Sequence, residues 1–441
     1  MSSPEKHYCF IRSLHIALPL LCAINASIVL FVIPHLNTLY PSLYNFEHFP
    51  DGYDQIASNI IEGAGYRFYP ETAETLMRSP GYTLLLAAIF LLFGKSLLAA
   101  KIANVILTIL TAYLIASISR KYVNNNTSVL FVPAFFLLHP ATIVAEARGG
   151  LEIFFAFALV LFVYCIYKAI ESHKALDHLL AGSILGLALL IKSTALFFPI
   201  FLLPCLLFSR ASDKRSGIVL RNFAFMIIAA FLILTPWIVR NYMLSTKFIP
   251  MTTLRGLTMY QGLYVNKNLF SKKEHWELLA EAAKNQDSFA IEAGLPFKRG
   301  FYQYFYHTND EVAFDNILVD KVKEEYTIAP SLFVRNCILN GIRFWVQGKT
   351  RNATILNIIL TVPFLCLVIL GVYFGLSKNL NIMPITLLIA AYILPHLVTI
   401  AVARYYMPLI PLLSILASIS LLHIGSLIEV RFPIRLTGSR K

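Results

Sequence analysis

Residues 179–208 read LLAGSILGLALLIKSTALFFPIFLLPCLLF, an apolar run of 30 residues whose only charged side chain is Lys192. One transmembrane helix needs about 20 residues, so the run is too long for a single span. Basic residues flank it on both sides, at Lys174 and at Arg210. Because basic loops remain cytoplasmic, the run must enter and leave the membrane on the same side. We therefore predict a hairpin of two short helices, with Lys192 near its outer turn.

The whole chain has the composition of a membrane protein. It has 441 residues, of which 57% are apolar and 14% charged, and its mean hydropathy is +0.67. These values exclude a soluble globule and are typical of an all-α polytopic membrane protein. The net charge of +13 lies in short loops between the apolar runs. This pattern indicates topology and contact with anionic membrane lipids, and we expect no nucleic-acid partner.

Working outward from the hairpin, we expect about ten transmembrane helices, with both termini in the cytoplasm. The apolar run 80–93 has only 14 residues, and a crossing there would invert every later basic loop. We predict that it is an interfacial or re-entrant helix in the first outward loop. The predicted spans are 14–33, 97–119, 127–145, 152–168, the two arms of 179–208, 218–238, 354–375, 381–402 and 406–427.

Three parts of the chain follow from this topology. Residues 1–239 form a transmembrane module that includes the first outward loop, 34–96. Residues 240–352 are polar and mixed in charge, which predicts a small outward subdomain with helices at 273–285, 310–326 and 330–346. Residues 353–441 contain the last spans and a basic cytoplasmic tail.

Charged side chains gather at the outward face. In membrane proteins, ionisable groups gathered in this way more often form a functional site than a merely solvated surface. Histidines near this face share no ligand spacing, so we interpret them as membrane-interface anchors, and no cofactor is certain from the sequence. The sequence leaves open whether Asp51 and a second acidic residue bind a divalent metal ion. The outward charged residues are Asp51, Glu146, Arg148, Glu152, Arg240 and Arg404.

Three short motifs carry a family resemblance. The first outward loop contains Asp51-Gly52-Tyr53, then Gly63-Ala64-Gly65-Tyr66, then Arg78-Ser79-Pro80-Gly81-Tyr82. TPWIVRNY follows the seventh predicted span at 235–242, and RYYMPLIP enters the last at 404–411. This layout resembles that of bacterial transferases of the GT-C fold. The group includes protein O-mannosyltransferases and the lipid A aminoarabinose transferase, and is glycosyltransferase family 39-like.

The resemblance implies a GT-C-type bundle that takes a sugar from a polyprenyl-phosphate donor, with Asp51 at the position of the presumed catalytic carboxylate. The family usually also carries an acidic residue at the head of the fourth span. Glu152 matches that placement best, and Glu146 competes with it. Either carboxylate could instead pair only with Arg148.

The chemistry of such a transfer agrees with these residues. A carboxylate must take the proton of the acceptor hydroxyl, and cations must stabilise the departing phosphate. Arg404, Arg240 and Lys192 are candidates for the phosphate, and Arg404 is the strongest because it precedes an interfacial tyrosine pair. Their alternative roles are a membrane anchor for Arg404 or Arg240 and a helix cap for Lys192. The predicted substrate-binding residues are Arg404, Tyr405, Arg240, Lys192, Arg148, Arg78 and Tyr53.

The sequence therefore predicts an inverting membrane glycosyltransferase with Asp51 as general base. Its acceptor would be a lipid, a glycan or a protein, and its site would face the periplasm or exterior of a bacterial inner membrane. The alternatives are a transporter or lipid flippase, and a non-catalytic polysaccharide-assembly component. A transporter would place its charges near the bilayer midplane and repeat its halves, and neither pattern is apparent.

Overall fold

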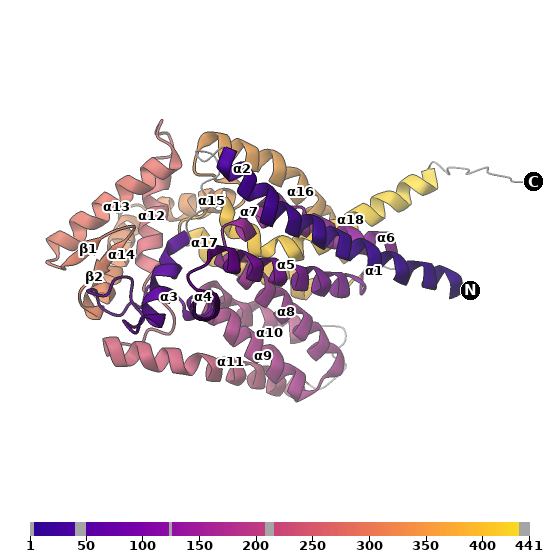
Figure 1. Cartoon of the computed structure of the whole chain (residues 1–441), viewed down its shortest axis with the longest axis horizontal. Helices are drawn as coiled ribbons and strands as arrows, with labels where there is room; N and C mark the ends of the chain where they lie inside the picture. The colour runs from indigo at the N-terminus through magenta and orange to yellow at the C-terminus, as the bar shows by residue number, and fades with distance from the viewer. Residues whose placement is uncertain (1–3, 40–49, 123–125, 208–215, 432–441) are drawn as a thin grey trace, which may run out of the picture.

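The computed structural model describes residues 4–39, 50–122, 126–207 and 216–431, and nearly all of its secondary structure is helical (Figure 1). The basic loop at 210–215 and the basic tail after residue 431 lie outside these described residues. The first half of the chain contains α1 (Pro4–Ser27), a π-helical turn (Ile28–Val32), α2 (Ile33–Leu39), α3 (Tyr53–Ile61), α4 (Pro80–Phe93), α5 (Leu97–Ser119), α6 (Asn126–Leu137), α7 (Pro140–Ala147), α8 (Leu151–Ser172), α9 (Ala175–Ile191), η3 (Ser193–Phe197), α10 (Phe198–Leu207) and α11 (Ser216–Ser245).

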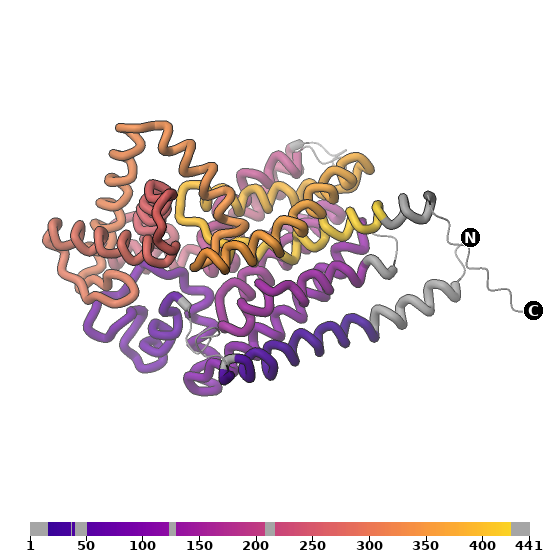
Figure 2. Tube along the Cα trace, turned by 90° about the horizontal axis from the view of Figure 1, so that it is seen from above, coloured from indigo at the N-terminus to yellow at the C-terminus, as the bar shows by residue number. Residues whose placement is uncertain are grey.

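The second half adds the segment between α11 and α16 and then the last helices. Its elements are α12 (Arg255–Lys267), α13 (His275–Glu292), β1 (Phe297–Arg299), β2 (Gln303–Phe305), α14 (Thr308–Ile328), α15 (Pro330–Val346), α16 (Arg351–Ser377), α17 (Met383–Val398), η4 (Ala403–Leu409) and α18 (Ile410–Arg431). Elements α12 to α14 and the β-hairpin gather at one end of the molecule, opposite the free ends of α1 and α18 (Figures 1 and 2).

Among the described residues, six helices are long and apolar enough to cross a membrane, and α6 with α7 would make a seventh. The chain is thus an integral membrane protein with multiple spans. The predicted total of about ten requires α9, α10 and α17 to cross as well, and these helices have only 17, 10 and 16 residues.

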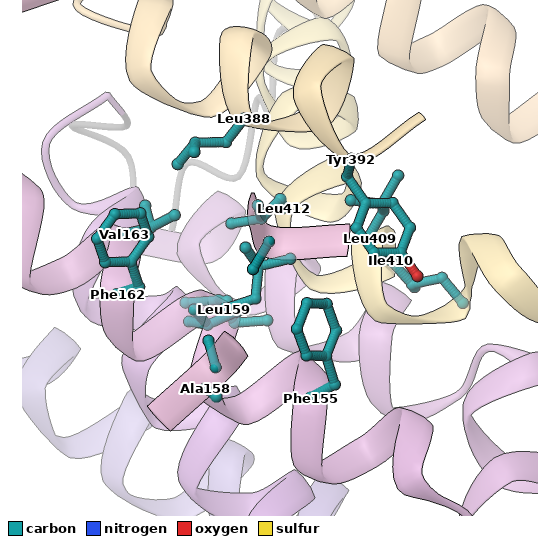
Figure 3. Close-up of a cluster of buried hydrophobic side chains, with 14 of the residues drawn as sticks. Phe155, Ala158, Leu159, Phe162, Val163, Leu388, Tyr392, Leu409, Ile410 and Leu412 are labelled. Carbon is teal, nitrogen blue, oxygen red and sulfur yellow. The ribbon is translucent and has the colours of Figure 1, made fainter. Parts of the chain in front are cut away.

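The core lies where α8 crosses the last helices. Phe155 of α8 stacks on Tyr392 of α17, with ring centres 5.7 Å apart. Leu159 and Phe162 of α8 belong to the same buried cluster as Leu409 of η4 (Figure 3). All five side chains are almost completely buried. Elsewhere, α9 lies so close to α11 that a Cβ on Gly182 would overlap the carbonyl of Met226. Small residues permit this close backbone approach between membrane helices.

Two interruptions shape the bundle. The run 179–208 breaks at Lys192, whose backbone is extended between α9 and η3, and the predicted break is confirmed. The predicted span 127–145 is not one straight helix, because α6 and α7 meet at an angle of 50°. Pro140 explains the bend. A proline disfavours helical geometry in the residue before it, and His139 is extended with ψ 127°.

The segment between α11 and α16 contains more secondary structure than the sequence indicated. The three helices expected there are present as α13, α14 and α15, while α11 continues to Ser245, past the expected boundary at 240. Helix α12 and the hairpin were not expected, so the all-α expectation needs a small correction. The hairpin pairs Phe297 with Phe305. Its strands have only three residues each, too few to show a period-2 pattern in sequence.

Candidate active site

Three charged side chains from distant parts of the chain meet at one point. Asp51 precedes α3, Glu152 begins α8, and Arg404 lies in η4. The Nη2 of Arg404 is 2.9 Å from Oδ2 of Asp51, and its Nε is 3.1 Å from Oε1 of Glu152. The two carboxylates thus share one guanidinium, through neighbouring N–H donors that are held in a fixed planar geometry. The structure therefore joins the three strongest sequence candidates in one cluster.

The backbone around Asp51 is held in an uncommon conformation. Asp51 has φ 68° and ψ 10°, and Gly52 follows with φ 73°. Left-handed geometry costs an L-residue roughly 1–2 kcal/mol, although aspartate tolerates it better than most residues. Helix α3 begins at Tyr53, directly after this turn. This conformation leads the chain into α3 and directs the Asp51 carboxylate at Arg404. Such strain is found preferentially at functional sites.

We expect Gly52→Ala to disturb this turn more than Gly63→Ala does. Both glycines have positive φ, +73° and +79°, so both alanines should lose roughly 1–2 kcal/mol of stability. A Cβ at Gly52 would also lie 2.9 Å from the Phe68 ring, whereas no atom lies within 4 Å at Gly63. Thermal unfolding and activity of the two variants measure the difference. Equal losses would show that the geometry around Asp51 does not depend on this turn.

The side chain of Arg78 contacts the same turn and stabilises it. Its Nε donates to the main-chain carbonyl of Asp51 at 3.1 Å. Its guanidinium lies 5.4 Å from the ring centre of Tyr53 and 4.7 Å from that of Tyr302, within the range of cation–π attraction. Arg78 is only 4% exposed and lies two residues before the start of α4. The predicted residues Arg78 and Tyr53 therefore frame the Asp51 turn.

The charge of the cluster shifts the pKa of Asp51. Burial alone would raise this pKa, but Arg404, and after it Arg78, favour the charged carboxylate. The net result is a pKa below the ordinary value for aspartate. Asp51 is thus an ionised carboxylate at neutral pH, although its side chain is only 15% exposed.

Two more cations face this cluster. Burial and the charge of Arg404 lower the pKa of Arg148, against the opposing effect of Glu152 and Asp51. Burial and the charges of Arg148 and Arg404 likewise lower the pKa of Lys349, which lies between α15 and α16. Burial is the larger cause in both cases, and repulsion by the neighbouring guanidinium of Arg404 adds to it. An anion bound among them would relieve that repulsion.

Lys192 approaches the cluster from the break between α9 and η3. Its Nζ donates to the hydroxyl of Tyr392 at 2.7 Å, and that hydroxyl donates to the carbonyl of Tyr405 at 2.9 Å. The ammonium also lies 5.0 Å from the ring centre of Tyr405. Lys192 and Tyr405 thus stand together beside Arg404, as the sequence predicted for a shared site.

Glu152 is positioned by the turn between α7 and α8. It is the second residue of α8, where the helix dipole favours a carboxylate. The carbonyl of Gly149 accepts a hydrogen bond from the hydroxyl of Tyr82, and the carbonyl of Gly150 accepts one from Nδ2 of Asn104 at 3.1 Å. These bonds tie the turn to α4 and α5 and fix the start of α8.

The remaining two candidates lie elsewhere. Arg240 pairs with Glu74 at 3.2 Å, and its guanidinium lies 4.4 Å from the ring centre of Trp237. Glu146 is fully buried between helices, where it accepts a hydrogen bond from Nδ2 of Asn25 at 2.9 Å. The structure therefore leaves Arg240 and Glu146 out of the cluster around Asp51.

Two contributors were missed by sequence reasoning. Tyr302 lies in the hairpin turn and Lys349 follows α15, and both interact with the cluster from the segment between α11 and α16. An aromatic run, Phe301 to Phe305, marks the first, but no sequence pattern marks the second. Within the described residues, no group of three or more His, Cys, Asp or Glu side chains is placed to hold a metal ion.

Comparison with known proteins supports the predicted resemblance. Residues 77–239 match the family model described as dolichyl-phosphate-mannose-protein mannosyltransferase, so the resemblance is confirmed for this part of the chain. The matched part contains Arg78, Glu152 and Lys192, but neither Asp51 nor Arg404. No curated protein matches the chain in sequence.

Solved structures share the fold. The oligosaccharyltransferase AglB from Archaeoglobus fulgidus, solved with an inhibitory peptide and a dolichol-phosphate, has 12% identity and a TM-score of 0.54 over 100% of this chain. The same organism's oligosaccharyltransferase tethered to an acceptor peptide has 11% identity and a TM-score of 0.54 over 98% of this chain. The chain spans only 53% and 52% of those proteins. The expected GT-C fold is confirmed by this likeness.

A third structure is more distant in shape. ArnT from Cupriavidus metallidurans, bound to undecaprenyl phosphate, has 13% identity and a TM-score of 0.41, and the match covers 95% of this chain and 80% of ArnT.

Proposed function

We propose that this protein is an inverting glycosyltransferase that moves a sugar from a polyprenyl-phosphate donor to an extracytoplasmic acceptor. The observation that carries the proposal is the cluster of Asp51, Glu152 and Arg404 with further cations around it. An ionised carboxylate within a surplus of positive charge suits a reaction in which one group accepts a proton while a phosphate departs. The family match and the shared fold support the same class.

In the proposed reaction, Asp51 takes the proton of the acceptor hydroxyl as that oxygen attacks the anomeric carbon. The bond between this carbon and the phosphate oxygen breaks on the opposite face, so the configuration inverts. The departing phosphate keeps the bonding electrons and is stabilised by Arg404, with Arg148, Lys192 and Lys349 close by. Glu152 pairs with the Nε of Arg404 and acts as a positioning residue.

The membrane arrangement that fits this reaction has about ten crossings, with the site on the outward face. Helices α9, α10 and α17 would then cross as short spans, and α4 would lie in the interface. Residues 1–239 and 353–441 would form the membrane module, and 240–352 the outward subdomain. Both termini would be cytoplasmic in a bacterial inner membrane. A lipid-borne phosphate would then meet Asp51 at headgroup depth.

A turnover assay tests the proposal directly. Purified protein in lipid vesicles is supplied with radiolabelled polyprenyl-phosphate hexoses and pentoses, together with lipid, glycan and peptide acceptors. We expect polyprenyl phosphate to be released with one sugar class, and a product of inverted anomeric configuration by NMR. Movement of labelled lipid between leaflets without sugar release would indicate a flippase, and binding of the donor without turnover would indicate a non-catalytic component.

The pH profile of the wild-type protein follows from the pKa of Asp51. Since this pKa lies below its ordinary value, the base should remain ionised from neutral pH down to about pH 4. A carboxylate whose pKa is lowered by folding stabilises the fold above its unfolded pKa, and this contribution is lost as the pH falls through the lowered value. We expect kcat/KM to show no ionisation of Asp51 between pH 5 and 8. An acid limb near pH 6 that disappears in a variant without Asp51 would contradict this.

A further inference from the structure

Helix α15 buries two asparagine side chains and exposes a row of three apolar ones. Asn336 and Asn340 are 2% and 1% exposed, whereas Val334, Ile338 and Ile342 are 58%, 59% and 57% exposed. The three apolar residues are spaced by four and therefore form one stripe along the helix. We call these three residues the α15 stripe. A helix facing water would present the opposite arrangement.

Hydrogen bonds hold α15 in this orientation. The Nδ2 of Asn266 donates to Oδ1 of Asn340 at 2.8 Å, and Nδ2 of Asn340 donates to the carbonyl of Leu397 at 3.0 Å. The Nδ2 of Asn336 donates to the hydroxyl of Tyr326 at 2.7 Å. Rotating the helix to hide the α15 stripe would break bonds to α12, α14 and α17 at once. Buried amides without partners are costly, so the exposed stripe is a fixed feature.

The α15 stripe adjoins a surface that a membrane would cover. Helix α15 packs against the start of α16, where Nδ2 of Asn357 donates to the carbonyl of Val346 at 3.2 Å. Helix α16 is a candidate span, and Leu356 and Ile359 in its first turns are exposed. Helix α15 itself is not a candidate span, and it carries Arg335 and Arg343. It thus has the character of a helix that lies on a membrane rather than across it.

We propose that the α15 stripe contacts the acyl chains of bilayer lipids, so that α15 is an interfacial helix beside the site. Two contacts at the end of α15 connect it with η4. The carbonyl of Gln347 accepts a hydrogen bond from the main-chain N–H of Ala403 at 2.9 Å, and the rings of Trp345 and Tyr406 lie 5.8 Å apart. Lipid contact along the stripe therefore sets the depth at which Arg404 stands. This inference does not depend on the proposed chemistry.

Fluorescence quenching by lipids tests the inference. The variant Ile338→Trp is reconstituted in phosphatidylcholine vesicles with or without brominated acyl chains, and the emission of the wild-type tryptophans is subtracted. The matched control is Lys323→Trp, at an exposed position on neighbouring α14. We expect the emission of the tryptophan at 338 to fall several-fold in brominated vesicles, and the emission at 323 to remain unchanged.

Equal emission of both variants in the two kinds of vesicle would overturn the inference. A stripe covered by a second copy of the chain would be unquenched, and a photoreactive residue at position 338 would then give crosslinked dimers. Val334→Trp, one turn away on the same stripe, provides a second measurement if Ile338→Trp does not fold. Sugar transfer is assayed separately, so failure of the lipid contact and failure of the proposed function are distinguishable.

Discussion

Sugar transfer by the Asp51→Asn variant is expected to be about 10²–10⁴-fold slower than transfer by the wild-type protein. The amide has nearly the shape of the carboxylate but cannot accept the proton of the acceptor hydroxyl. Asparagine also tolerates the left-handed backbone at this position, so the turn before α3 should persist. The loss should therefore lie in kcat rather than in the amount of folded protein.

The measurement is turnover of a radiolabelled donor by folded protein in vesicles, with Glu62→Gln as the matched control. Glu62 is a carboxylate of the same loop, 54% exposed and paired with Lys95. Exposed pairs contribute at most about 1 kcal/mol, so this control should keep its activity. Wild-type turnover by Asp51→Asn would remove Asp51 as the base and move that role to Glu152, the other carboxylate that binds Arg404.

Arg404→Gln is expected to have two separable effects. The rate should fall by about 10²–10³-fold, because the phosphate loses a preorganised donor. The pKa of Asp51 should also rise, because burial, which alone would raise it, would no longer be offset by the largest opposing charge. Since a base must be ionised to act, the remaining activity should fall as the pH falls through this raised value. The acid limb of kcat/KM should therefore move to higher pH.

A second substitution separates positioning from chemistry. Arg404 holds both carboxylates, so its removal leaves Asp51 and Glu152 facing each other without their shared partner. Adding Glu152→Gln to Arg404→Gln removes that repulsion and should return the acid limb toward lower pH. The two changes should not be additive, as is usual for residues in contact. An acid limb at the same pH in the wild type, in Arg404→Gln, in Glu152→Gln and in the double variant would show that Arg404 does not control the charge of Asp51.

The sequence was most informative about the spans. Helix α5 occupies 97–119 as predicted, because Ser96 caps its start and Arg120 ends the apolar run. Spans were less predictable where a proline bends the chain, as at Pro140. Hydropathy alone does not distinguish a bent pair of helices from one straight helix. The break at Lys192 was predictable because the length and the flanking charges allowed no single crossing.

The candidate site was predictable from motifs only in part. Asp51 stands out through the motif of the first outward loop, whereas Glu152 and Arg404 stand out because each is a charge at the end of an apolar run. The same criterion selected Arg240 and Glu146, which the structure places with Glu74 and Asn25 instead. Charge patterning gives the side of the membrane on which a residue lies, but not its position across the bundle. That position depends on helix packing, which a single sequence does not reveal.

The meeting of Asp51 and Arg404 also has a consequence for biosynthesis. The two residues are separated by 353 positions, so the chain contains the first long before the second. At ribosomal speeds of 5–20 residues per second, about 20–70 s pass between their synthesis. Throughout this interval the inserted helices have no complete cluster. Activity should therefore first appear when η4 and α18 enter the bundle. Docking of this last segment is then the step that activates the newly synthesised protein.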